Sequence, residues 1–279
     1  MALLPADDVA NRVAEHPAWY HTLELAPGVV TPGFFDLRGV VDRLPWPTVT
    51  ARRCLDVATM DGFYAFELER RGAAEVVAID IEDQADLDWL PRDVPPDHRR
   101  GREPSGVRFE VAHDALGSQV ERRILNVYDL SPDRVGHFDV VIVGALLEHL
   151  RDPLRALEAI RSVTAGALLS VEQVDLRTSL VLRRTPVERV VGHTRTWAQP
   201  NRAGHLALLH ATGFDVVEAR MLGIPLGPSG RDRPVGAGLG GRLRAGLRTA
   251  ARRTLTGSPH WPFSAVHARP APGLNPRPG

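Results

Sequence analysis

The strongest constraint on the fold is a series of short apolar runs that alternate with helix-like segments. Five runs read as buried strands: RCLDVA, EVVAID, VERRILNVYDL, FDVVIVGALL and ALLSVEQ. Helical patterns fall at 62–73, 152–166 and 201–214, and DVVEARML and SAVHARP read as a closing strand pair. Strands that alternate with helices predict a parallel sheet with helices on both faces.

Three segments differ from this pattern. Residues 1–50 hold turn signals and no clear period, which predicts a helical or irregular N-terminal cap before a domain at 51–270. An arginine-rich insertion at about 223–259 places Leu239, Leu243 and Leu247 four apart, so it is either a basic helix for an anionic surface or, as we favour, a solvated helix packed by its leucines. Residues 271–279 are expected to be a disordered tail.

Composition excludes several functional classes. The 279 residues contain no lysine, which excludes a lysine base or Schiff base, and their single cysteine excludes an internal disulfide. There is no apolar run of membrane-spanning length and no secretory signal pattern, so we expect a cytoplasmic protein without a membrane partner. The formal net charge is zero, but nine arginines and one acid lie in 231–279, so the remainder is net acidic.

The turn within CLDVATMDGFYAF, residues 54–66, has an unusual composition for a nucleotide-binding loop. It follows the first predicted strand and has Asp56 and Asp61 at its ends, with Gly62 as its only glycine. Ligands of open parallel sheets bind at the carboxyl ends of the strands. Two carboxylates there disfavour a pyrophosphate and favour a ligand with positive charge and hydroxyl groups, such as S-adenosylmethionine.

Asp80 is the second indication of this ligand. It ends the next predicted strand, where an acid can accept hydrogen bonds from both hydroxyls of a ribose. The alternative is a helix cap or a surface charge, and the acidic turn before it favours the ribose interpretation.

The segment LDVATMDGFYAFELERRGAAEVVAID resembles the first motif and second-strand acid of class I S-adenosylmethionine-dependent methyltransferases. NVYDLSP and FDVVIVGALLEHLRDPLRALEAIRSVT continue the resemblance, which spans roughly residues 19–218. HTLELAPGVVTPGFFDLR is similar to the wobble-uridine carboxymethyltransferase-like branch. The resemblance implies a Rossmann-like seven-stranded sheet, mostly parallel, with an antiparallel last strand. This chain departs from the motif at Ala58, where glycine is usual and where alanine should disfavour a left-handed turn.

The resemblance also implies a cofactor site for S-adenosylmethionine. The loop would approach the methionine part, Asp80 the ribose, the segment after the third strand the adenine, and the end of the fourth strand the methyl group. The residues so implied are Asp56, Ala58, Thr59, Asp61, Gly62, Asp80, Ile81, Asn126, Val127, Tyr128, Gly144 and Ala145.

Catalytic and acceptor residues are less constrained. Candidate bases lie near the ends of the fourth and fifth strands and in the cap, with His149 favoured because it occupies the short connection after Gly144; these are His149, Glu148, Glu172 and His21. Aromatic and amide side chains that could line an acceptor pocket are Trp19, Tyr20, Phe34, Trp197 and Asn201. No metal site is expected, because His205 and His210 are five residues apart and do not share a helix face.

The sequence therefore predicts a methyltransferase that acts on a small molecule, with secondary metabolism as one context for it. Two alternatives stay open: a tRNA wobble-uridine-modifying transferase, which the net acidic body disfavours, and a cofactor-binding scaffold without methyltransferase activity. The acceptor and the oligomeric state are not predicted.

Overall fold

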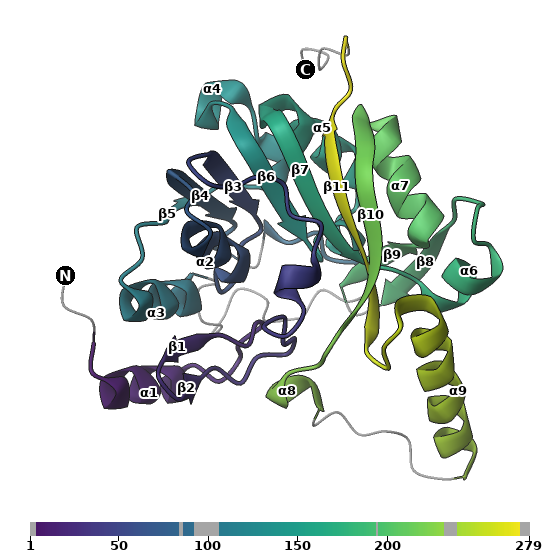
Figure 1. Ribbon diagram of the computed structural model, residues 1–279, viewed down its shortest axis with the longest axis horizontal. Helices are drawn as coiled ribbons and strands as arrows, with labels where there is room; N and C mark the ends of the chain where they lie inside the picture. The colour runs from purple at the N-terminus through teal and green to yellow at the C-terminus, as the bar shows by residue number, and fades with distance from the viewer. Residues whose placement is uncertain (1–3, 84–85, 92–105, 194, 232–238, 274–279) are drawn as a thin grey trace.

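The computed structural model describes residues 4–83, 86–91, 106–193, 195–231 and 239–273. Its centre is a seven-stranded sheet in the order β10-β11-β7-β6-β3-β4-β5 (Figure 1). The strands are β3 (Arg53–Val57), β4 (Glu75–Asp80), β5 (Glu121–Ile124), β6 (Phe138–Gly144), β7 (Thr164–Gln173), β10 (Phe214–Ile224) and β11 (Trp261–Pro270). Strands β3 to β7 pair in parallel, and β11 runs antiparallel to both β7 and β10. The predicted fold class is confirmed.

Strand residues alternate between two apolar layers, because successive side chains of a strand point to opposite faces. Cys54, Val140 and Ile142 join the layer on one face, and Leu55, Val141 and Val143 join the other. The first face is covered by α2 (Phe63–Arg70) and α3 (Val107–Leu116), with α1 (Ala6–Glu15) packed beyond α3. The second face is covered by α4 (Pro132–Val135), α5 (Pro153–Val163) and α7 (Arg202–Ala211).

The cap, residues 4–50, lies beneath the carboxyl ends of the parallel strands in Figure 1. It contains α1, the small β1–β2 sheet (Glu24–Ala26 and Val29–Val30) and the short helix η1 (Val41–Arg43). Trp19, Leu25 and Phe35 are buried in the same apolar layer as Phe63 and Phe66 of α2. The cap is therefore packed onto the domain core.

Two further additions extend the same edge of the molecule. Between β7 and α7 the chain forms α6 (Leu176–Val181) and the antiparallel hairpin β8–β9 (Glu188–His193 and Thr196–Pro200). Between β10 and β11 lie α8 (Pro228–Arg231) and the arginine-rich α9 (Leu239–Thr256), which packs on α6 and the β10–β11 pair. Leu247 of α9 is exposed, so that leucine does not pack as predicted. The side chains of Leu239 and Leu243 lie outside the described part.

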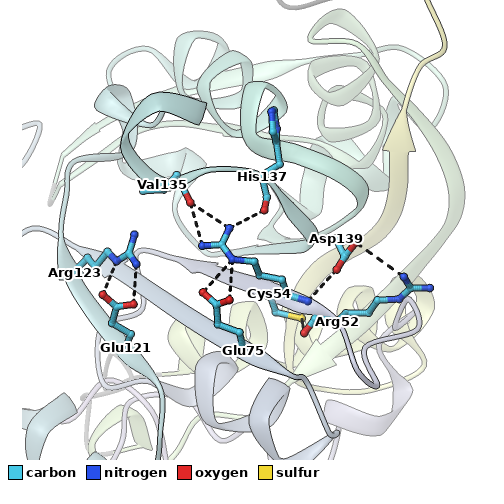
Figure 2. A network of polar contacts seen from close by, with 9 residues as sticks. Arg52, Cys54, Glu75, Glu121, Arg123, Val135, His137 and Asp139 are labelled. Atoms are coloured by element: carbon cyan, nitrogen blue, oxygen red, sulfur yellow. Dashed lines mark hydrogen bonds and ion pairs between the residues drawn. The ribbon is translucent and has the colours of Figure 1, made fainter.

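The opposite edge, where the parallel strands begin, is fastened by ion pairs (Figure 2). Arg53 at the start of β3 bonds both carboxylate oxygens of Glu75 at 3.0 and 2.9 Å and donates to the carbonyl of His137 at 2.7 Å. Arg123 pairs with Glu121 on the edge strand β5. These groups are satisfied among themselves, which leaves the carboxyl edge as the place for a ligand.

Several element boundaries differ from prediction. The third apolar run gives only the four-residue β5, because Asn126 caps a separate short helix, η3 (Val127–Asp129), through a 3.0 Å bond to the amide of Tyr128. The helix predicted to reach residue 166 ends at Val163, and Thr164 already belongs to β7. No helix in the described ranges has the length and apolar content that a membrane crossing requires.

Candidate active site

The loop between β3 and α2 adopts an unfavourable backbone conformation. Ala58 and Met60 have φ of +59° and +51°, in the left-handed region, and Gly62 follows at +90° as the residue before α2. Each non-glycine residue there costs roughly 1–2 kcal/mol. Alanine at position 58 disfavours this conformation, as expected, but does not prevent it, because the surrounding contacts impose it. Such strain concentrates at functional sites.

Asp56 supports this loop from inside. One of its carboxylate oxygens accepts the Thr59 hydroxyl at 2.6 Å and the Ala65 amide at 3.1 Å. Burial raises the pKa of Asp56 to about 7, partly offset by these two bonds. Asp56 and Thr59 are both buried, so their side chains fix the loop, and any contact with the methionine part of a cofactor falls to backbone groups.

Asp61 joins the loop to the cap. Its buried carboxylate accepts hydrogen bonds from the backbone amides of Tyr20 and of His21, the latter at 2.9 Å. The Arg108 guanidinium of α3 lies 3.4 Å from the other oxygen. The structure supports a role for Asp61 in shaping the loop, because one oxygen is bonded to the cap and the other faces Arg108.

Asp80 remains suited to a ribose. Its two oxygens each accept one backbone amide, from Met60 at 2.7 Å and from Ile81 at 2.8 Å. Each carboxylate oxygen has a second lone pair, so a diol can still be bound. Burial raises the pKa of Asp80 to about 6, which the two amide bonds and Arg122 counteract. Its remaining acceptor lone pairs fit the two hydroxyls of the ribose of S-adenosylmethionine.

Residues 126–128 form the next side of the site. Val127 is buried in the second apolar layer, whereas Tyr128 donates its hydroxyl to Asp88 at 2.6 Å and accepts the amide of Asp152 at 3.0 Å. Asn126 uses its side-chain oxygen as a helix cap. The side chains of all three residues are thus engaged by the protein itself.

Two buried carboxylates meet at the ends of β6 and β7. Glu172 accepts the amides of Leu146 and Leu147 at 3.4 and 3.2 Å, and Glu148, in the short helix η4 (Leu147–His149), accepts Gln199 of the hairpin at 2.9 Å. Burial raises the pKa of Glu148 to about 7. Burial and then the charge of Glu148 raise the pKa of Glu172 well above its usual range.

His149 contacts the hairpin. Its Nδ1 lies 2.8 Å from the carbonyl oxygen of Arg195 in the turn between β8 and β9, and its Nε2 lies 3.9 Å from a Glu148 oxygen. Its side chain is 37% exposed, and burial of the remainder lowers its pKa. The ring is thus positioned beside the carboxylates and also holds the turn.

A small cavity with largely aromatic walls, with room for about one water molecule, lies between the cap and the sheet. The strand ends Gly144 and Ala145 form one wall, and Ala145 is left-handed at φ +51°. A Cβ on Gly144 would come within 2.5 Å of the Tyr64 ring, so glycine is required there. The other side chains around it are Tyr20, His21, Phe35, Leu37, Tyr64, Val171, Ile224 and Phe263.

Four predicted pocket residues make structural contacts within the protein. Trp19 is 2% exposed in the cap core and donates its indole N–H to the Val13 carbonyl, so its assignment to the acceptor pocket is wrong. The assignment of Asn201 to the acceptor pocket is also wrong. Asn201 is fully buried as the N-cap of α7, where its side-chain oxygen accepts the Gly204 amide at 2.7 Å and its side-chain nitrogen donates to two carbonyls. Trp197 donates to the Asp88 carbonyl at 2.8 Å, which fastens β9 to the segment after β4. Phe34 packs edge-to-face on Phe35.

Sequence reasoning missed Tyr64, Phe35 and Gln199. Tyr64 was detectable, because it follows Gly62 by two residues in the first turn of α2. Phe35 and Gln199 reach the site only through the tertiary positions of the cap and the hairpin, for which the chain has no local signal.

Known proteins share the sequence pattern and the fold of this chain. Residues 35–219 match the family described as "Methyltransferase domain". The N-terminal domain of EvdMO1 with SAH bound superposes with a TM-score of 0.54 at 17% identity, covering 96% of this chain and 98% of that one. The [4+2]-cyclase SpnF gives 0.53 at 18%, covering 96% and 93%.

Magnesium protoporphyrin IX methyltransferase from Synechocystis PCC 6803, with SAH bound, gives a TM-score of 0.48 at 15% identity, covering 80% and 76%. A comparison with curated protein sequences finds no match. The family match covers most of the chain, and the fold and the Asp80 site agree with it; this chain belongs to the class I S-adenosylmethionine-dependent methyltransferases.

Proposed function

We propose that this methyltransferase acts on a small-molecule acceptor held between the cap and the ends of β6 and β7. The observation that carries the proposal is the position of Tyr20 and His21: their backbone amides bond to Asp61 of the cofactor loop, and their side chains line the cavity beside Gly144. The cap therefore covers the place where the methyl group should lie. A site enclosed in this way favours a small acceptor over a nucleic acid.

S-adenosylmethionine supplies an electrophilic methyl group when bound. In this assignment Asp80 holds the ribose, the strained loop from Ala58 to Gly62 meets the methionine part, and residues 126–128 border the adenine. Methyl transfer needs the acceptor in line with the reacting bond, and positioning supplies much of the rate. The aromatic walls provide that positioning. The candidate proton acceptors are Glu148, Glu172, His149 and His21, of which His21 lines the cavity.

The tRNA-modifying alternative rests on the sequence resemblance to the wobble-uridine branch. An RNA substrate requires phosphate contacts from a basic surface. The arginine-rich α9 packs against α6 and the β10–β11 pair. No described residue of α9 lines the cavity. We therefore rank this alternative second. A scaffold role, or chemistry other than methylation, is ranked third; SpnF is described as a cyclase on the same fold.

One labelling experiment separates these functions. Purified protein is incubated with methyl-labelled S-adenosylmethionine and either the low-mass metabolite fraction or the tRNA fraction of the host, with Asp80→Ala as the matched control. We expect label in the low-mass fraction only, and none with the variant. Label in tRNA would favour the second function, and label in neither fraction, despite cofactor binding, would favour the third.

We also propose a cytoplasmic location, supported by the single buried and unpaired Cys54. Fractionation of host cells tests it, and recovery in the extracellular fraction would contradict it.

A further inference from the structure

The outer face of α9 carries a stripe of apolar groups that points to solvent. Leu247, Ala250 and Thr254 have the i, i+3, i+7 spacing of one helix face, and all three are exposed, Leu247 by 64%. The Thr254 hydroxyl donates to the Ala250 carbonyl at 3.1 Å, so its polar group is satisfied inside the helix. A helix that only packs on its own domain would turn such a stripe inward.

The opposite face of α9 already attaches the helix to the domain. Thr249 and Arg252 are half-buried on that face, and Thr256 is buried. The Arg252 guanidinium lies 4.8 Å from the centroid of the Trp261 ring at the start of β11, and the Thr256 hydroxyl donates to the Arg252 carbonyl at 2.9 Å. The outward stripe is therefore not used by these contacts and is open to a partner.

Arginines flank the stripe, and no acid accompanies them. The 18 residues of α9 include five arginines and neither aspartate nor glutamate. At about 100° per residue, Arg248 and Arg253 fall on opposite sides of Leu247, and both side chains are exposed. Positive charge thus lies on both sides of the stripe.

The neighbouring segment 176–187 has the same character. It contains α6, which contacts α9, and the turn after it, and it has no acidic residue. Val181 at the end of α6 is 73% exposed. The exposed arginines of this segment are Arg177, Arg183 and Arg184.

An anionic membrane surface satisfies both parts of this face. Acidic lipid headgroups attract arginines, and the boundary with the acyl chains accepts an aliphatic stripe from a helix that lies in the plane of the interface. Nucleic acid offers phosphates but no apolar layer for Leu247. The net charge of the whole chain is zero, so attraction to an anionic surface has to come from this local concentration of arginine.

We propose that α9 and segment 176–187 form a docking surface for the anionic lipid headgroups of a membrane. The contact is peripheral. The expectation of no membrane partner was based on the lack of a spanning segment, and a surface contact requires none. Because α9 extends the edge of the molecule that carries the cap (Figure 1), attachment brings the candidate active site close to the membrane.

Cosedimentation with vesicles tests the docking surface. The full chain is mixed with vesicles of equal parts phosphatidylglycerol and phosphatidylcholine, and with vesicles of phosphatidylcholine alone. We expect the anionic vesicles to bind at least about tenfold more tightly, and this affinity to fall at least about tenfold between about 0.1 and 0.5 M salt. Equal binding to the two vesicles, or binding to neither, would overturn the proposal.

Charge reversal assigns the binding to α9. Each arginine near an anionic membrane contributes about fivefold to the binding constant, so Arg248→Glu/Arg253→Glu should weaken binding at least about twentyfold. The matched control is Arg134→Glu/Arg269→Glu, which changes net charge equally at exposed sites on α4 and near the other end of β11. All these positions are exposed, and native melting confirms folding. Equal losses in the two double variants would overturn the role of α9.

A second pair of variants separates a membrane from other anionic partners. Leu247→Ser should weaken vesicle binding about three- to tenfold, because its side chain no longer enters the apolar boundary. Leu154→Ser, at a 43% exposed position of α5, should not change it. The same affinity in Leu247→Ser and Leu154→Ser would overturn the membrane assignment. Micromolar binding of tRNA or poly-L-glutamate, without binding to anionic vesicles, would assign the face to a nucleic acid or an acidic protein and would also overturn it.

Discussion

Asp61→Asn should loosen the cap from the cofactor loop. The wild-type carboxylate accepts two backbone amides of the cap and faces Arg108 at 3.4 Å, and its side chain is almost completely buried. Replacing a charged acceptor by a neutral one costs about 1 kcal/mol for each of the two bonds. The new amide nitrogen also faces the Arg108 guanidinium, and the loss of this buried ion pair adds about 2 kcal/mol. The expected loss in unfolding free energy is therefore about 4 kcal/mol.

Urea unfolding measures this loss, and limited trypsin digestion reports where the structure opens. Asp36→Asn is the matched control in the same cap, because Asp36 pairs with Arg38 in a partly exposed bridge worth about 1 kcal/mol. Cleavage of the Asp61→Asn variant should begin within the cap, at Arg38 or Arg43, before the sheet domain unfolds. Methyl transfer should fall more than S-adenosylhomocysteine affinity, because Tyr20 and His21 lose their positions. A variant that unfolds like Asp36→Asn would refute the reasoning.

Three further predictions follow from the same contacts. Burial raises the pKa of Glu148 to about 7 from an ordinary 4.5, so the folded state binds its proton more tightly than the unfolded state does. The stability of the wild type relative to Glu148→Gln should therefore fall by up to about 3 kcal/mol as pH rises from about 4.5 to 7. Urea unfolding at several pH values checks this, and a stability difference that does not change with pH would contradict it. His149→Gln can still donate to the Arg195 carbonyl, so turnover should stay within about threefold, whereas a loss of 10²-fold with native melting would identify His149 as the general base. Asn201→Ala removes the N-cap of α7 and a bond to the Val187 amide, so thermal unfolding should show a loss of roughly 2–4 kcal/mol, and a change below 0.5 kcal/mol would contradict its structural role.

The sheet was predictable because strand order and covering helices follow from a repeated local pattern. Residues 140–143 are all apolar, a pattern typical of a strand buried on both faces. Asp152 and Pro153 mark the start of α5. Asp80 was predictable for a similar reason, since the end of a parallel strand has a fixed place in the fold.

The acceptor side was less predictable, because its residues converge through long-range packing. Asn201 and Trp19 have the chemistry of pocket residues, but their burial and hydrogen-bond partners depend on α7 and on the cap core. The left-handed conformation of Ala58 was not predicted, because alanine prefers the right-handed region. Asp56 and Asp80 impose this conformation through their hydrogen bonds to Thr59 and Met60. Local rules identified the cofactor loop, and tertiary contacts determined what its carboxylates do.

Calorimetric titration of S-adenosylhomocysteine into wild type, Asp80→Ala and the exposed-site control Glu158→Gln tests the central assignment most directly. We predict one binding site per chain in wild type and in the control, and binding about 10- to 100-fold weaker in Asp80→Ala. The variant loses two charge-assisted hydrogen bonds to the ribose, worth roughly 1.5–3 kcal/mol each, and water recovers part of this loss. Equal affinity in wild type and Asp80→Ala would contradict the ribose assignment, and no binding to wild type would contradict the account of the site.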